Sequence, residues 1–218
     1  MDSGWSLKHM HRLMVTSAAY QRSSSVGTDA SAVAIDPDNH FLWRMNVGRM
    51  EAEVVRDSLL FAAGNLDPKM GGQELENSEA LTSHRRSLYF SCYPEQGGKS
   101  AFGELFDGPN ALDCYRRARS VIPQQALALT NSDLVHQLTG TVATTLWSQA
   151  EAAQTAEGTV TDRFIAAAFE QILTRRPTAQ ERDTCAAYLV SSEGTTDLAL
   201  RESFVRALLN HNDFVTIR

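Results

Sequence analysis

Residues 42–60, LWRMNVGRMEAEVVRDSLL, combine apolar residues at helical spacing with three arginines and three acidic residues. Just before this stretch, Asp36 is placed as an N-cap, and Pro37 suits the first helical position. We therefore predict a helix from Asp36 to Ala63, with Gly64 as its C-terminal stop. Its predicted apolar stripe consists of Trp43, Val47, Met50, Val54 and Phe61.

The charged residues of this predicted helix form two further lines. Glu53 lies four residues after Arg49 and three before Arg56, so it can pair with both. Arg44 and Glu51 share the other line. Three interpretations stay open: a solvated face, where exposed pairs contribute about 0–1 kcal/mol each, a buried ion network, and a ligand site. The candidate residues in this stretch are Arg44, Arg49, Glu51, Glu53, Arg56 and Asp57.

Helical periodicity dominates the rest of the chain. We expect a helix at residues 6–20, a long irregular region at 65–104 and one short strand or hairpin at most, near 85–93. Pro123 opens another helix, and Thr178 with Glu181 forms a capping box for a later one. Core positions of the C-terminal helices are Leu134, Leu138, Val142, Leu146, Phe164, Ala168, Ile172, Leu198, Phe204, Leu208 and Leu209. The sequence predicts a mainly α, irregular multi-helix fold of five to seven helices, in a single domain over residues 1–218.

Composition narrows the classes of partner. The 218 residues carry a formal net charge of −6, so a nucleic-acid partner is not expected. No apolar run reaches the roughly 18 residues of a membrane span. Seventeen of the twenty basic residues are arginine, whose planar guanidinium forms forked pairs with anionic groups.

No common catalytic or metal-binding motif is intact in the sequence. The six histidines include no pair three or four residues apart, and we expect neither a metal nor a cofactor. Cys92, Cys114 and Cys185 have no metal-ligand spacing; a Cys92–Cys114 bridge beside a free Cys185 stays open.

Two more arginine clusters, HRRSLYF and CYRRARS, each lie near a tyrosine and an acidic residue. Their candidate residues are Arg85, Arg86, Asp107 and Arg117. Together they predict an anion-binding patch for carboxylate or sulfate groups. The alternative is structural: the same arginines tie loops to carboxylates or to helix C-termini.

Eight landmarks in order carry a family resemblance: HRLMVTSAAYQRSS (11–24), DPDNHFLWRMNVGRMEAEVVRDSLL (36–60), GNLDPKMGG (64–72), RRSLYF (85–90), ELFDGPN (104–110), CYRRARSVIPQQALALTN (114–131), RRPTAQE (175–181) and ALLNHNDFV (207–215). Over residues 5–215 the chain resembles the C-terminal domain of unknown function of large planctomycete-type secreted proteins. There the domain follows another uncharacterised domain and often a cytochrome c-like one. In that family two blocks of positions recur, which implies a buried network that locks the long helix to the arginine-rich loop. The first block matches Trp43, Arg44, Arg49, Glu51, Glu53, Arg56 and Asp57, and the second matches Arg117, Ser120 and Gln125.

The resemblance has consequences for location and partners. It implies that the chain is a C-terminal fragment of an exported protein, periplasmic or extracellular, although residues 1–20 show no signal peptide. Upstream domains of the parent chain are then the expected partners. The resemblance carries no established reaction.

Two functions from different classes follow. The first is a scaffold or interaction domain that presents an arginine-lined surface to a partner domain or an acidic polysaccharide. The second is a polysaccharide-acting enzyme with acids such as Glu51, Glu53, Asp57 or Asp107 paired across a cleft. Electron transfer is a third option, but the sequence has no CxxCH haem attachment site.

Overall fold

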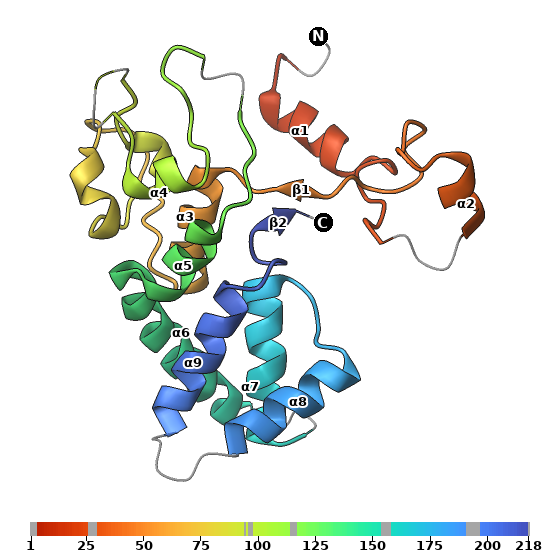
Figure 1. Ribbon diagram of the computed structural model, residues 1–218, viewed down its shortest axis with the longest axis vertical. Helices are drawn as coiled ribbons and strands as arrows, with labels where there is room; N and C mark the ends of the chain where they lie inside the picture. The colour runs from red at the N-terminus through yellow and green to blue at the C-terminus, as the bar shows by residue number, and fades with distance from the viewer. Residues whose placement is uncertain are drawn as a thin grey trace. The chain divides into compact units, whose positions relative to one another are not determined.

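The computed structural model describes residues 4–25, 30–93, 95, 98–113, 117–153, 158–190 and 197–217. Within these ranges it contains nine α-helices and one two-stranded antiparallel sheet, so the predicted mainly α fold is confirmed (Figure 1). In chain order, the elements are α1 (Leu7–Val15), α2 (Ala30–Ile35), β1 (Gly48–Arg49), α3 (Ala52–Ala62), the 3₁₀ helices η1 (Asn77–Leu81) and η2 (Ser87–Tyr89), α4 (Ala101–Leu105), α5 (Pro123–Asn131), α6 (Asp133–Ala152), α7 (Val160–Ala168), the π-helical η3 (Phe169–Leu173), α8 (Ala179–Val190), α9 (Asp197–Leu209) and β2 (Thr216–Ile217). The expected five to seven helices are too few, because α2 and α4, with six and five residues, are too short to show a helical period.

The chain divides into two compact units. Unit 1 consists of residues 1–49 and 216–218, and unit 2 consists of residues 50–215. The single domain expected over residues 1–218 stays a prediction, since two compact units can belong to one folded domain.

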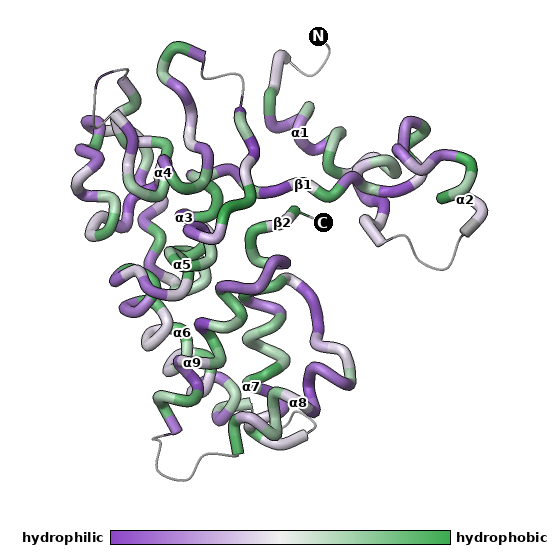
Figure 2. Tube along the Cα trace, viewed as in Figure 1, coloured by the Kyte–Doolittle hydropathy of each residue, from purple (hydrophilic) through white to green (hydrophobic). Residues whose placement is uncertain are grey.

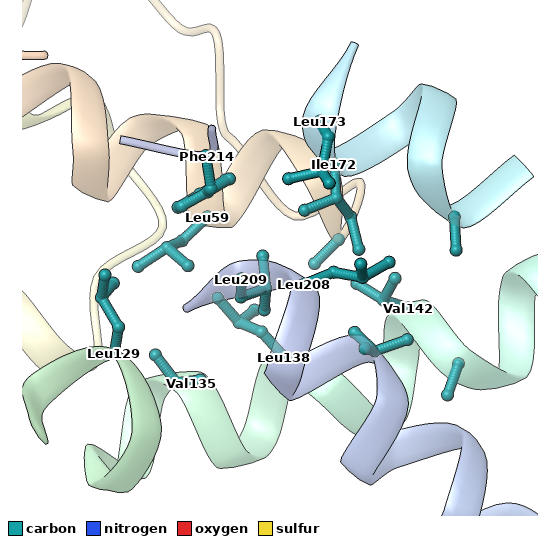
Figure 3. Packing of buried hydrophobic residues seen from close by; sticks show 14 of the residues in the cluster. Leu59, Leu129, Val135, Leu138, Val142, Ile172, Leu173, Leu208, Leu209 and Phe214 are labelled. Atoms are coloured by element: carbon teal, nitrogen blue, oxygen red, sulfur yellow. The ribbon is translucent and has the colours of Figure 1, made fainter. Parts of the chain in front are cut away.

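The core of unit 2 is built around α6. Its predicted apolar positions Leu134, Leu138 and Val142 are all buried, as are Phe204 and Leu208 of α9, which packs along it. Figure 3 shows side chains from α3, α5, α6, η3 and α9 converging there, with Phe214 from the segment after α9. Of the predicted core positions in α9, only Leu198 is exposed.

Helix ends in unit 2 follow local chemistry. Pro123 occupies the first turn of α5, and the Ser132 hydroxyl accepts the Val135 N–H at the start of α6. The predicted capping box at α8 is confirmed: Glu181 Oε2 accepts the Thr178 N–H at 2.8 Å, and Thr178 Oγ1 accepts the Glu181 N–H at 3.2 Å. These caps set where each helix begins.

The long helix expected from Asp36 to Ala63 is wrong in its first half, because helix α3 begins only at Ala52. The Asp36 carboxylate caps a turn, accepting the His40 and Phe41 N–H groups at 2.9 and 2.8 Å. Asn39 and Leu42 then adopt left-handed φ angles of 58° and 54°, which end any right-handed helix. Side-chain to backbone bonds at this turn therefore replace helical ones.

The predicted apolar stripe is also wrong over most of its length, although Met50 is partly buried against the core. Phe61 is 66% exposed and Val54 is exposed, whereas α3 buries Ala52, Val55, Leu59 and Leu60. The Leu59 side chain points into the core in Figure 3. With the helix start moved to residue 52, its buried face includes Arg56, a charged position.

Residues 65–104 are mostly irregular, interrupted by η1, η2 and the start of α4. The strand expected near 85–93 is wrong: residues 87–89 form η2, and only isolated bridges join Asp67 to Arg85 and Leu75 to Phe90. The sheet lies instead in unit 1, where Gly48 pairs with Ile217 and Arg49 with Thr216. Two strands far apart in sequence give no local hairpin signal.

Unit 1 differs from unit 2 in burial. Its described residues include no buried apolar side chain; the buried ones are Asp36, Asn39 and Thr216. Helix α1 starts as predicted, with Ser6 as N-cap, but ends at Val15, where the Thr16 hydroxyl bonds the Arg12 carbonyl. Figure 2 shows green apolar and purple polar residues alternating along α1.

Candidate functional site

Arg56 is the most buried charged residue described, with 1% of its surface exposed. It reaches from α3 into the irregular segment that follows. Its Nε–H donates to the Ala80 carbonyl at 2.8 Å, and Nη1 donates to the Arg85 carbonyl at 2.9 Å and the Ser87 hydroxyl at 3.1 Å. Nη2 donates to the Ser83 carbonyl. Four hydrogen bonds from one guanidinium thus hold residues 80–87 against α3.

The charge of Arg56 has nearby compensation. Its guanidinium lies over the Phe90 ring, 4.9 Å from the centroid, and 3.7 Å from Asp57 Oδ1. Burial lowers the pKa of the Arg56 guanidinium, and the Asp57 carboxylate partly offsets this. The group stays protonated at neutral pH, because an arginine pKa starts far above it.

Asp57 anchors the same segment through its carboxylate. Oδ1 accepts the Ser87 N–H at 2.8 Å, and Oδ2 lies 3.9 Å from Arg86 Nε. Arg56 and Asp57 are adjacent in sequence, and both bind Ser87. The start of η2 is therefore held by one cation and one anion from α3.

Glu53 faces a different segment. Its two oxygens accept hydrogen bonds from Arg117 Nη1 and Nη2 at 3.1 and 3.0 Å, a forked pair. Glu51 Oε2 lies 3.8 Å from the same guanidinium. The pairing of Glu53 with Arg56, expected from their spacing, is wrong, because Arg56 lies on the buried face of α3.

Two more candidate residues organise loops. Arg85 lies over the Tyr89 ring at 4.1 Å and donates to the Gly71 carbonyl at 2.5 Å, while the Tyr89 hydroxyl accepts the Gly71 N–H. Asp107 Oδ2 accepts the Ser120 N–H at 2.5 Å. Buried Gln125 donates to the Leu105 carbonyl at 2.8 Å, which ties α5 to the end of α4.

The structure places eight of the ten predicted site residues in unit 2 and two in unit 1. Arg44 lies beside its neighbour Trp43, and Arg49 lies in β1. In unit 2, ion pairs join four candidates from α3 and its N-cap to Arg86 and Arg117 or to one another. These four are Glu51, Glu53, Arg56 and Asp57. Cys114 lies outside the described residues, and Cys92 and Cys185 are free thiols.

One charged network was missed by sequence reasoning. Arg175 forms a forked pair with Glu181 at 2.9 and 2.7 Å and donates from Nε to Asp213 at 2.8 Å. The hydrogen bonds from Arg175 lower the pKa of Glu181 to about 2, even though burial opposes this. Asp213 is 38 residues from Arg175, so no local pattern signals this contact.

In the part of the chain that the structure describes, two hollows border α3. The first has a volume of about 50 Å³ and is lined by Glu53, Arg56 and Cys92 among others. This is room for a few water molecules and far below the roughly 300–1,000 Å³ of small-molecule sites. The second is an open groove of about 510 Å³ on the exposed face of α3. It is lined by Glu53, Val54, Asp57, Ser58, Phe61, Leu66, Pro68, Arg86 and Leu88.

The groove brings two carboxylates, Glu53 and Asp57, onto one open surface. Glu53 is held by the forked pair with Arg117, and Asp57 is held by the Ser87 N–H at 2.8 Å, with Arg56 3.7 Å away. Among the described residues, no group of three His, Cys, Asp or Glu side chains could hold a metal ion. Nor does any described helix combine the length and apolarity needed to cross a bilayer.

Comparison with known families matches residues 1–189 to PSD1, a protein of unknown function (DUF1553). No curated protein and no solved structure matches the chain significantly. The resemblance to a domain of unknown function is thereby confirmed, whereas the planctomycete-type and cytochrome c associations stay predictions. Since the match covers most of its length, the chain belongs to the PSD1 family of proteins of unknown function (DUF1553).

Proposed function

We propose that the chain is a non-catalytic interaction module of an exported multidomain protein, and that unit 2 is its rigid body. The proposal rests on one observation: the charged side chains of α3 bind other segments of the chain. Arg56 and Asp57 bind residues 80–87 and Glu53 binds Arg117, through hydrogen bonds that include five of 2.8–3.1 Å. Residues committed to such cross-links position loops and are not free for proton transfer.

The groove on α3 is the surface that this proposal assigns to a partner domain. Val54, Phe61 and Leu88 are exposed along it, and clustered exposed apolar residues mark interaction sites. Arg86 at its edge is about half exposed and contacts Asp57 only at 3.9 Å, so it can meet an anionic group of that partner. The partner is a protein domain that precedes this one in longer family members, as the family resemblance implies.

An acidic polysaccharide fits the groove less well. The predicted arginine-lined surface needs free guanidinium groups, but Arg56 is buried and Arg117 is paired with Glu53. Two carboxylates line the same groove and repel an anionic chain. Binding to acidic glycans is therefore tested beside binding to the partner domain.

An enzyme that acts on a polysaccharide is the second candidate, because Glu53 and Asp57 open into one groove beside the exposed Phe61. Paired carboxylates across a cleft are the usual arrangement for glycoside hydrolysis. The contacts of both acids oppose this role, because Arg117 occupies both oxygens of Glu53, and the Ser87 N–H and two arginines hold the Asp57 carboxylate.

One experiment separates these roles. The purified chain is titrated calorimetrically with the preceding domain of a longer family member, and tested for binding and hydrolysis on an array of neutral and acidic glycans. The proposal expects binding to the domain that Phe61→Ser weakens at least tenfold, with Leu127→Ser, an exposed site on α5, as control. Glycan turnover that Glu53→Gln abolishes without loss of thermal stability would establish the enzyme instead.

A further inference from the structure

Helix α1 of unit 1 has an apolar face that is exposed in the part of the chain described. Leu7, Met10 and Met14 lie three and four residues apart on this face, with Leu13 beside them, and all four are exposed. Leu7 is 73% exposed. An amphipathic helix of nine residues is marginal by itself in water, so its stability depends on covering the apolar side.

The opposite face of the same helix carries Lys8 and Arg12, which are neighbours at i and i+4, with His9 beside them. His11 lies four residues after Leu7 and three before Met14, at the edge of the apolar face. Residues 4–25 contain three Lys and Arg residues and no acid, although the whole chain has a net charge of −6. Positive charge is thus concentrated beside an exposed apolar face in an acidic protein.

Aromatic residues flank the helix. Trp5, 77% exposed, precedes the N-cap, and Tyr20, 53% exposed, follows the last turn. Trp and Tyr prefer the boundary between lipid headgroups and acyl chains, because each has an apolar ring and a polar atom. A basic polar face, an apolar face with Leu and Met, and terminal aromatics together describe an interfacial helix.

We infer that α1 lies on the surface of an anionic phospholipid bilayer, with Leu7, Met10, Leu13 and Met14 in the acyl boundary and Lys8 and Arg12 at the headgroups. A second copy of the chain is a weaker occupant. The four side chains offer much less than the roughly 800 Å² per partner of a stable interface. The inference is independent of the role proposed for the groove on α3, which lies in unit 2.

Vesicle co-sedimentation tests this. The full chain is mixed with extruded vesicles of phosphatidylcholine alone, or of phosphatidylcholine with about 40 mol% phosphatidylglycerol, an anionic lipid that gives the surface a negative potential. We expect binding to the anionic vesicles only, and weaker binding as salt rises. Each cation near such a surface raises the partition coefficient about fivefold, so Lys8→Gln with Arg12→Gln lowers it about 25-fold. The matched charge control is Lys69→Gln with Arg182→Gln, two exposed cations of unit 2.

The apolar face has its own variant. Leu7→Ser with Met14→Ser abolishes sedimentation, while Val33→Ser with Ile35→Ser, exposed positions of α2, leaves it unchanged. All substituted side chains are exposed, so folding is preserved and circular dichroism verifies it. Equal sedimentation with both lipids, or no effect of the α1 variants, overturns the inference. So does a dimer in analytical ultracentrifugation that the α1 variant converts to monomer without any vesicle binding.

Discussion

Arg117 and Glu53 form a forked ion pair across 64 residues of sequence, with nitrogen to oxygen distances of 3.1 and 3.0 Å. Both side chains are about one quarter exposed. The pair joins α3 to the segment that leads into α5, and Asp107 bonds the same segment through the Ser120 N–H. The spacing of residues along the sequence cannot signal such a contact. This contact nevertheless decides which segment the charged N-terminal end of α3 binds.

The forked geometry predicts a difference between arginine and lysine at position 117. Arg117→Lys keeps the charge but cannot make two parallel bonds, so we expect a loss of about 0.5–1 kcal/mol in the free energy of unfolding. A double-mutant cycle with Glu53→Gln, followed by urea denaturation, should give a coupling energy of about 1 kcal/mol. Arg182→Lys, at an exposed pair with Asp183, is the control. A coupling of zero would show that the pair is incidental.

Arg56 predicts a much larger effect. Arg56→Met keeps much of the apolar volume but removes four hydrogen bonds and leaves the carbonyls of Ala80, Ser83 and Arg85 without their donor. We expect a loss of about 3–4 kcal/mol, since breaking a buried charged network leaves unsatisfied partners. Hydrogen exchange should increase selectively in residues 77–91. Arg86→Ala, half exposed, should change stability by less than about 0.5 kcal/mol. Similar losses for the two variants would contradict the role assigned to Arg56.

The sequence predicts the C-terminal helices well because their signals are local and strong. In α6, Leu134, Leu138, Val142 and Leu146 repeat every four residues after a serine cap, and all are buried. A period sustained over several turns outweighs any competing turn signal. The same reasoning fails for Asp36 to Ala63, where apolar residues also recur at helical spacing.

The failure at Asp36 has a physical cause. Its carboxylate can cap either a helix or a tight turn, and the side chain of Asn39 tips the balance toward the turn. Asn39 donates to the Arg44 carbonyl at 2.8 Å and adopts a left-handed φ at little cost. The candidate site was harder still to predict, because the partners of Arg56 are mostly backbone carbonyls that no residue pattern reveals.

Glu181 predicts a loss of stability in acid. Its pKa is about 2 when folded and near 4.5 when unfolded, so the unfolded chain takes up a proton first as pH falls. The stabilisation is complete above about pH 5 and disappears between about pH 4.5 and 2. Because the side chain is about one third exposed, we expect about 1–2 kcal/mol, below what the full pKa difference implies.

Urea titrations at pH 7, 4 and 2.5 measure this loss. Glu181→Gln should flatten the pH dependence of the free energy of unfolding, while Asp183→Asn, an exposed neighbour, should not. A residual slope remains in Glu181→Gln, because hydrogen bonds from Thr159 lower the pKa of Asp162 as well. An unchanged slope in Glu181→Gln would show that the Arg175 network does not respond to protonation.

Thr174 is a position where substitution should raise stability. It follows η3 with a φ of 55°, a left-handed conformation in which a β-branched residue is strained, and its side chain is exposed. Glycine adopts this conformation freely at helix C-termini, but it also gains entropy in the unfolded chain. The balance favours Thr174→Gly by about 0.5–1 kcal/mol, or an increase of about 1–4 °C in Tm for a chain of this size. Differential scanning calorimetry measures the shift, and Thr174→Val, which keeps the β-branch and the strain, should show no increase. If both variants melt at the same temperature, the left-handed turn stores no strain that glycine relieves.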